Sequence, residues 1–228
     1  MKAPLADRLR PKNIDEGAGQ RHLLGQGKVL RRIIESGQIP NLIFYGPSGV
    51  GKTTVANIIA EKCGKKLYHL NATVCSTQGI KDIISSLDTF MAPNGVLLYL
   101  DEIQYFNKKQ QQTLLEYIEN GQITLIASTT ENPYFAVYNA LISRSTVFEF
   151  KPVPPEELEK AVERAFRCME EQLGSELVLE DGVSEYIAKG SGGDVRKALN
   201  TVELSALAAE PQESRSLVTL ETAVSLTQ

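Results

Sequence analysis

Short apolar runs recur along the first two thirds of the chain and predict the strands of a sheet. Several are apolar throughout, which is typical of parallel strands covered on both faces. Segments with helical spacing of apolar residues separate them, so the alternation predicts a doubly wound α/β fold with a parallel five-stranded sheet. The five predicted strands are Leu42–Tyr45, Lys66–Leu70, Val96–Leu100, Thr124–Ser128 and Val147–Phe150.

The polar and apolar spacing between these runs predicts three helices: Thr53–Lys62, Thr77–Phe90 and Asn107–Asn120. In the second, the apolar stripe consists of Ile80, Ile83, Ile84 and Leu87. The third has Leu114, Leu115 and Ile118 on one side and is followed by Gly121, a residue that favours helix ends.

A domain boundary is predicted at Lys151-Pro152-Val153-Pro154-Pro155, because closely spaced prolines cannot continue a central strand. Pro155 suits the first turn of a helix. Beyond it the pattern is helical, with further helices at Val183–Ala188 and Val195–Ala209. We therefore expect an α/β domain over residues 1–151 and a small helical domain over residues 152–228.

The loop after the first predicted strand has the sequence Gly46-Pro47-Ser48-Gly49-Val50-Gly51-Lys52-Thr53-Thr54. It matches G-x-x-x-x-G-K-[ST], in which backbone N–H groups surround phosphate oxygens at the start of a helix. Lys52 is expected to reach the β- and γ-phosphates, and Thr53 is expected to bind Mg²⁺. The motif predicts that the loop binds a nucleoside triphosphate, so we expect the α/β domain to be a nucleotide-binding domain.

Two carboxylates, Asp101 and Glu102, end the apolar run Val96–Leu100. We expect Asp101 to hold Mg²⁺ through its water shell and Glu102 to orient and deprotonate the attacking water. The alternative is an ordinary solvated strand end. The adjacent pair favours hydrolysis over binding alone, and the Asn-Lys-x-Asp element with which small GTPases recognise guanine is absent from the sequence.

Further polar residues complete the predicted site. At the end of Thr124–Ser128, Thr130 is preferred over Thr129 as the contact to the γ-phosphate, although either could simply cap the strand. Asn71 is a weaker candidate for steering Glu102. Arg144 and Arg196 carry planar guanidinium groups suited to phosphate oxygens, but on spacing alone each could equally be a surface ion-pair residue.

Composition excludes several other classes of protein. The 228 residues are 42% hydrophobic and 23% charged, as expected for a soluble globular protein, and no apolar run is long enough to cross a bilayer. Three widely spaced cysteines indicate neither disulfides nor zinc, and with no secretory signal they predict a cytosolic location. A net charge of −4 argues against coating by nucleic acid, apart from a local basic patch in the first 32 residues.

Taken together, these motifs resemble the AAA+ ATPases, and among them the replication-associated recombination protein A family, which includes the Werner-helicase-interacting ATPases. The resemblance covers nearly the whole chain. The resemblance to the AAA+ ATPases rests on five motifs: Gly46–Thr54, Asp101-Glu102, Ser128–Asn132, Ser143-Arg144 and Gly193–Arg196. The resemblance to the narrower family rests on Pro4–Pro11, Gly19–Gly25, Thr129–Pro133 and Asp194–Asn200. Clamp-loader subunits and RuvB-like motors share parts of this set.

The resemblance implies several residue roles. Arg144 would be an arginine finger that acts on ATP bound to a neighbouring copy of the chain, and Arg196 would touch the γ-phosphate in its own subunit. Arg10, Pro11, Gly19 and Gln20 would line the adenine pocket. Two positions depart from the family pattern: Gly17-Ala18 replaces a larger apolar pair, and Tyr105 replaces a common arginine.

The function implied is Mg-ATP hydrolysis coupled to work on DNA forks or junctions in replication, recombination and repair. The expected partners are DNA, neighbouring copies and replication proteins, with no membrane, and the location is cytoplasmic or, in a bacterium, nucleoid-associated. Two alternatives remain: a clamp-loader-like ATP switch, and a nucleotide-gated binding module with little hydrolysis. The family's C-terminal oligomerisation domain is expected to be absent, and the isolated chain is expected to be slow.

Overall fold

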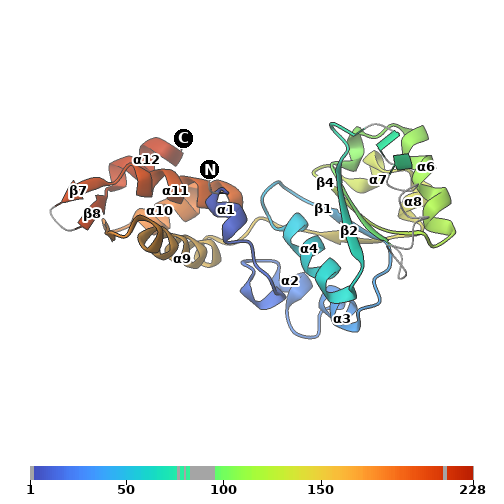
Figure 1. The fold of residues 1–228 in the computed structure, drawn as a ribbon, viewed down its shortest axis with the longest axis horizontal. Helices are drawn as coiled ribbons and strands as arrows, with labels where there is room; N and C mark the ends of the chain where they lie inside the picture. Colours follow the sequence, from blue (N-terminus) through green and yellow to red (C-terminus); the bar gives the residue numbers. More distant parts are fainter. Residues whose placement is uncertain (1–2, 76–77, 80, 83–95, 213–214, 228) are drawn as a thin grey trace.

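The computed structural model describes residues 3–75, 78–79, 81–82, 96–212 and 215–227. Its larger part is a parallel sheet of five strands in the order β2-β3-β4-β1-β5, with every neighbouring pair parallel (Figure 1). The strands are β1 (Leu42–Tyr45), β2 (Lys66–Asn71), β3 (Val96–Asp101), β4 (Ile123–Thr129) and β5 (Thr146–Glu149). The predicted fold class and all five predicted strands are confirmed, with ends that differ by at most one residue.

Helices cover both faces of this sheet because the buried strands are apolar on both sides. Leu42 and Phe44 of β1 belong to one core cluster and Ile43 to the other, as the alternation of strand side chains requires. The first face is covered by α2 (Arg21–Leu24), α3 (Val29–Ser36) and α4 (Lys52–Cys63). The second face is covered by residues of α6 (Lys108–Glu119) and α8 (Asn139–Ile142), with α7 (Pro133–Ala136) beside them.

Local sequence signals set the helix boundaries. Asn107 and Gln110 form a capping box at the start of α6, each side chain bonding the other's backbone N–H. Short 3₁₀ helices follow Asn13 and Glu102, at η1 (Ile14–Glu16) and η2 (Ile103–Tyr105). The helix predicted over Thr77–Phe90 lies largely outside the described residues, as do the four residues of its apolar stripe.

The C-terminal part contains the predicted helices and also a small sheet. Its helices are α9 (Pro155–Leu173), α10 (Val183–Gly190), α11 (Val195–Leu207) and α12 (Leu220–Thr227). The strands β6 (Glu176–Leu179), β7 (Glu210–Gln212) and β8 (Arg215–Val218) form a sheet in the order β6-β8-β7. The expectation of helices alone was wrong here, because strands of three or four residues are too short to show a period.

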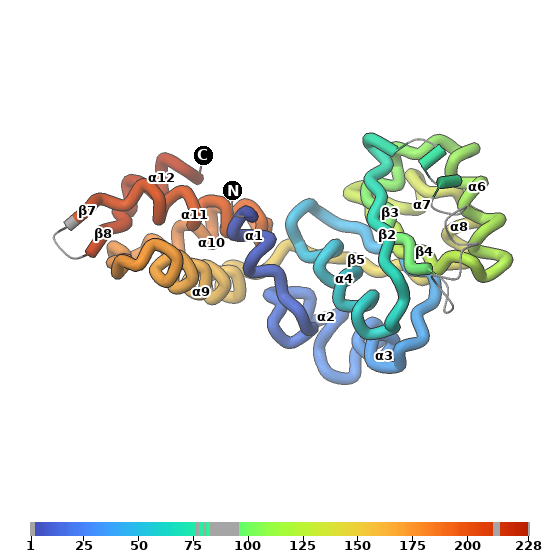
Figure 2. The backbone as a smooth tube through the Cα atoms, in the orientation of Figure 1, coloured from blue at the N-terminus to red at the C-terminus, as the bar shows by residue number. Residues whose placement is uncertain are grey.

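The N-terminal helix α1 (Leu5–Arg8) packs against this C-terminal part and not against the large sheet. Leu5 is fully buried in the same core cluster as Val162 and Val202. Figure 2 shows the chain leaving this region, forming the sheet and returning to α9, so that two connections join the two parts. In the described part of the chain, no helix combines the length and apolar character needed to cross a bilayer.

Candidate nucleotide site

Glycine is required at two positions of the loop that joins β1 to α4. Gly46 has φ +141°, and a Cβ there would lie 2.0 Å from the carbonyl oxygen of Phe150. Gly49 has φ +67°, and its Cβ would lie 1.7 Å from Oδ1 of Asp194, which caps α11. Left-handed backbone and these close approaches exclude larger side chains. The loop therefore fits tightly between β5 and the N-terminus of α11.

Lys52 begins α4 and is buried, with 7% of its surface exposed. Its Nζ donates to the carbonyl oxygens of Gly46 and Pro47, at 2.6 Å each. Burial lowers the pKa of Lys52, and the nearby carboxylates of Glu102 and Asp101 act in the opposite direction. A desolvated ammonium group beside a helix N-terminus is an environment that a phosphate anion would stabilise.

A buried tyrosine joins the two residues predicted to bind Mg²⁺. The hydroxyl of Tyr99, on β3, lies 3.1 Å from Oγ1 of Thr53 and donates to Oδ1 of Asp101 at 3.4 Å. Ser128 on β4 also donates to Oδ1 of Asp101. Burial, and then the charge of Asp101, raise the pKa of Tyr99 well above its usual value, so the phenol stays protonated.

Thr53 and Asp101 fit the chemistry of Mg²⁺, which prefers oxygen ligands and usually binds few protein groups together with phosphates and water. Among the described residues, no three His, Cys, Asp or Glu side chains converge to form a self-contained metal site.

Glu102 follows β3 in the left-handed conformation, with φ +56° and ψ +48°. This conformation is costly for a residue with a side chain and is often found at functional sites. Oε2 of Glu102 accepts hydrogen bonds from Nε2 of Gln104 and from Oγ1 of Thr130, the latter at 3.4 Å. Gln104 also donates to Thr130 at 3.3 Å. The structure thus brings Thr130 to the proposed base.

Thr129 and Asn71, the other two polar residues predicted to lie at the site, form hydrogen bonds with residues other than Glu102. Thr129 is fully buried, and its Oγ1 accepts a hydrogen bond from the backbone N–H of Glu131 at 3.0 Å. Oδ1 of Asn71 accepts from the backbone and side chain of Thr73, at 2.9 and 2.7 Å. Neither residue belongs to the hydrogen-bond network of Glu102.

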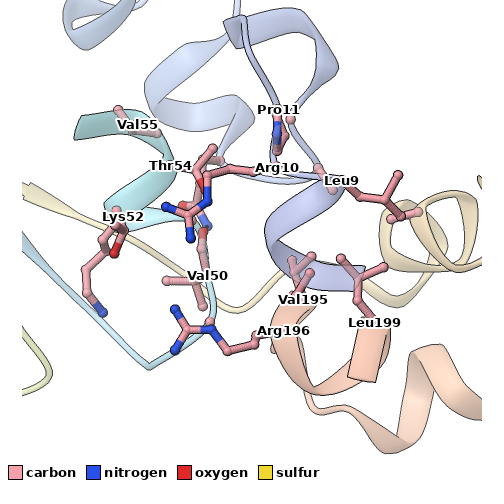
Figure 3. Close-up of a pocket in the computed structure, with 18 of the residues that line it drawn as sticks. Leu9, Arg10, Pro11, Val50, Lys52, Thr54, Val55, Val195, Arg196 and Leu199 are labelled. Carbon is pink, nitrogen blue, oxygen red and sulfur yellow. Dashed lines mark hydrogen bonds between the residues drawn. The ribbon is translucent and has the colours of Figure 1, made fainter. Parts of the chain in front are cut away.

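A cleft between the sheet and the C-terminal helices is lined by Lys52, Thr53, Asp101 and Glu102 (Figure 3). Its cationic side chains come from four separate segments of the chain: Arg10, Lys52, Arg164 and Arg196. The acidic lining residues are Asp7, Asp101 and Glu102, so the described lining carries one more positive than negative side chain.

Most of the predicted binding residues line this cleft. They include Ser48 to Thr54 of the loop, Arg10, Pro11, Gln20 and Arg196. The lining also contains Gly17 and Ala18, the pair that departs from the family pattern. Gly46 and Pro47 instead accept hydrogen bonds from Lys52, and Gly19 is absent from the lining. The N–H of Gly19 donates to Glu157 at 2.8 Å, and a Cβ there would meet Val153 at 2.7 Å.

Gln20 has a structural contact as well as a place in the cleft. It is buried in a left-handed conformation, and its Nε2 donates to the carbonyl oxygens of Val50 at 3.2 Å and Lys151 at 2.6 Å. Its Oε1 accepts from the N–H of Lys151 at 3.0 Å. The amide thereby joins the glycine loop to the segment that leads into α9.

Arg144 lies apart from the cleft. It precedes β5, whereas the glycine loop lies at the carboxyl ends of the parallel strands, so the length of β5, about 13 Å, separates them. Its guanidinium forms an ion pair with Glu119 at 2.7 Å and donates to the carbonyl oxygen of Ala140 at 3.0 Å. Arg144 therefore cannot reach a nucleotide in its own cleft in this conformation.

Sequence reasoning missed four polar residues of the site: Tyr99, Ser128, Gln104 and Arg164. Tyr99 and Ser128 were assigned to apolar strands, although a hydroxyl in a fully buried run signals a polar partner nearby. Asp194 was recognised as the cap of α11, and its Oδ1 does accept from the N–H of Lys197 at 2.9 Å, but its contact with the glycine loop was not foreseen.

Comparison with known proteins identifies families and structures that are similar to this chain. Residues 42–153 match the family model described as ATPase family associated with various cellular activities (AAA). Replication-associated recombination protein A of Haemophilus influenzae is 39% identical over 216 residues, covering 92% of this chain and 48% of the relative. The protein of that name from Bacillus subtilis is 39% identical, covering 96% and 52%. ATPase WRNIP1 of Dictyostelium discoideum is 34% identical, covering 93% and 24%.

Among solved structures, the Thermotoga maritima RuvB Holliday junction branch migration motor is similar, with a TM-score of 0.73 and 26% identity. The similarity covers 96% of this chain and 72% of that one. The chain spans about half the length of the bacterial relatives it matches. The glycine loop, the paired carboxylates and these relatives agree: the chain belongs to the AAA+ ATPases of the replication-associated recombination protein A family.

Proposed function

We propose that the chain binds Mg-ATP in the cleft and hydrolyses it by in-line attack of water on the γ-phosphate. The observation that carries this proposal is the convergence of Lys52, Asp101, Glu102 and Arg196 on one cleft. Mg²⁺ bound with the nucleotide would neutralise charge on the β- and γ-phosphates. Thr53 and Asp101 are the residues that would hold it.

Each cationic residue of the site has a place in this reaction. Lys52 exchanges its two carbonyl partners for phosphate oxygens, which relieves the cost of its burial. Arg196, at the start of α11, supplies a second positive charge from the opposite wall of the cleft (Figure 3). Arg10 and Pro11 would lie near the adenine, and Arg196 would contact the γ-phosphate.

Glu102 acts as the general base in this proposal. Its carboxylate orients the attacking water and accepts its proton, while Thr130 and Gln104 hold the carboxylate through the hydrogen bonds described above. The left-handed backbone of Glu102 turns its side chain out of the line of β3. In this proposal, the costly backbone conformation of Glu102 serves to position the general base.

Arg144 completes the site of a neighbouring copy. Its position before β5, at the opposite end of the strands from the glycine loop, and its exposed side chain support a role in trans. The exposed ion pair with Glu119 is a weak interaction that assembly could replace. An arginine finger contributes about 10³- to 10⁵-fold in rate, so the separate chain is expected to be slow.

We further propose that hydrolysis is coupled to work on DNA at forks or junctions. Support comes from relatives named for replication and recombination and from a structural neighbour named as a branch migration motor. Those names describe the relatives themselves, and this chain spans about half the length of the two recombination proteins.

The test is ATP turnover with and without forked DNA, for the wild-type chain and for Glu102→Gln. We expect Glu102→Gln to bind an ATP analogue normally and to lose nearly all turnover, and forked DNA to stimulate the wild type without any sliding clamp. A requirement for a clamp would favour the clamp-loader alternative. Unchanged turnover in Glu102→Gln would favour a binding module with little hydrolysis.

A further inference from the structure

We propose that Tyr99 is a positioning residue that fixes the orientation of the Thr53 hydroxyl and of the Asp101 carboxylate for Mg²⁺. The inference deepens the proposed Mg-ATP site and rests on it. Its basis is the pair of contacts made by one buried phenol, to Thr53 at 3.1 Å and to Asp101 at 3.4 Å.

The direction of the two hydrogen bonds follows from the chemistry of the partners. A carboxylate can only accept, so the Tyr99 O–H donates to Asp101. The oxygen of Tyr99 is then available to accept the proton of the Thr53 hydroxyl. In this arrangement Thr53 directs its hydrogen toward Tyr99, and its lone pairs remain available for a cation.

The carboxylate of Asp101 is oriented by the same cluster. Both hydroxyl donors, Tyr99 and Ser128, bond Oδ1, and none of the described residues donates to Oδ2. Two donors on one oxygen fix the rotation of the carboxylate and leave the second oxygen for a metal-bound water. The cluster thus favours one orientation of each predicted ligand before the metal arrives.

The surroundings of Tyr99 hold the phenol in place. It is 1% exposed and belongs to the core cluster under α4, the helix that carries Thr53, and its ring lies 4.9 Å from the ring of His69. A side chain that is fully buried in a close-packed core keeps its position when a ligand binds. The phenol is therefore a fixed reference that joins α4 to β3.

The experiment compares Tyr99→Phe with wild type by following Mn²⁺ binding with electron paramagnetic resonance in the presence of a non-hydrolysable ATP analogue. We expect Mn²⁺ affinity to fall about 3- to 10-fold, the range for one lost hydrogen bond. Binding of the analogue without metal, measured in EDTA, should be unchanged. Tyr186→Phe, on α10 and away from the cleft, is the matched control and should behave as wild type.

Two results would overturn the inference. One is wild-type Mn²⁺ affinity in Tyr99→Phe; the other is an equal loss of affinity for the metal-free analogue, which would indicate a packing role. Ser128→Ala provides a second test, because it removes the other donor to Asp101 and should also weaken Mn²⁺ binding. Failure of the wild type to bind metal with the analogue would instead contradict the proposed function.

Discussion

Two adjacent threonines at the end of β4 have different environments, and this difference predicts different effects of mutation. Thr130 contacts the carboxylate of Glu102, so Thr130→Ala should reduce turnover about tenfold, with ATP affinity retained. Thr129 is buried, and its side chain accepts a hydrogen bond from the backbone N–H of Glu131, so Thr129→Val should cost about 1 kcal/mol of stability and leave turnover nearly unchanged.

The measurements are steady-state ATP hydrolysis and chemical unfolding of both variants. A larger loss of turnover in Thr129→Val than in Thr130→Ala would reverse the assignment of the two residues. The sequence allowed a preference for Thr130, but it could not exclude Thr129, because both follow the same apolar run. The side-chain partners distinguish them.

The role of a residue could be predicted from the sequence where it depends on neighbours along the chain. The glycine loop and Asp101-Glu102 are contiguous motifs whose geometry follows from a few residues, and the structure brings them to one cleft. Tyr99 could not be recognised in this way, since its function depends on a contact with Thr53, 46 residues away. Gly19, which precedes the cleft residue Gln20, has a packing constraint that the sequence also did not reveal, because a Cβ there would lie 2.7 Å from Val153.

At the level of elements, the contact between α11 and the glycine loop predicts the effect of a single methyl group. The backbone N–H of Val195 donates to the carbonyl oxygen of Gly49 at 3.0 Å, and Asp194 fills the space beside it. Gly49→Ala must therefore separate the loop from α11. We expect a loss of about 2–4 kcal/mol in the free energy of unfolding, from overpacking and a left-handed alanine together.

Gly174 provides a matched control for this prediction. Its φ of +65° is almost equal to the +67° of Gly49, but a Cβ there would meet nothing within 4 Å. Gly174→Ala should therefore cost only about 1–2 kcal/mol, the conformational cost alone. Chemical denaturation compares the two variants, and analogue binding should weaken only in Gly49→Ala. Equal losses of stability would show that α11 does not press on the loop in solution.

The element-level predictions succeeded where hydrophobic burial determines structure. The three central strands of the large sheet, β1, β3 and β4, are buried on both faces, so their apolar runs were visible in the sequence. β6 and β8 are four residues each and pair in parallel across about 35 intervening residues, which no local pattern reveals. The place of Leu5 in the C-terminal core is likewise a long-range packing result, from the contact of α1 with α11.

At the level of the whole molecule, the separation of Arg144 from the cleft predicts that activity depends on a second copy. Arg144→Ala should reduce turnover by about 10³-fold or more in the assembled protein while ATP affinity stays nearly unchanged. Arg144→Lys should recover little of this loss, since an ammonium group lacks the planar fork of a guanidinium. An equal loss of ATP affinity in Arg144→Ala would contradict a role in trans.

Mixing two inactive variants tests the same dependence directly. Lys52→Ala loses the phosphate contact but keeps Arg144, and Arg144→Ala keeps its own cleft but cannot complete a neighbour's. If Arg144 acts in trans, a mixture of the two contains interfaces in which an intact cleft faces an intact Arg144, so turnover should rise above that of either variant alone. The mass of each sample with an ATP analogue identifies the conditions of assembly. If an assembled mixture shows no gain in turnover, Arg144 either takes no part in the reaction or acts on the nucleotide of its own subunit. If it takes no part, its role is structural, through the ion pair with Glu119.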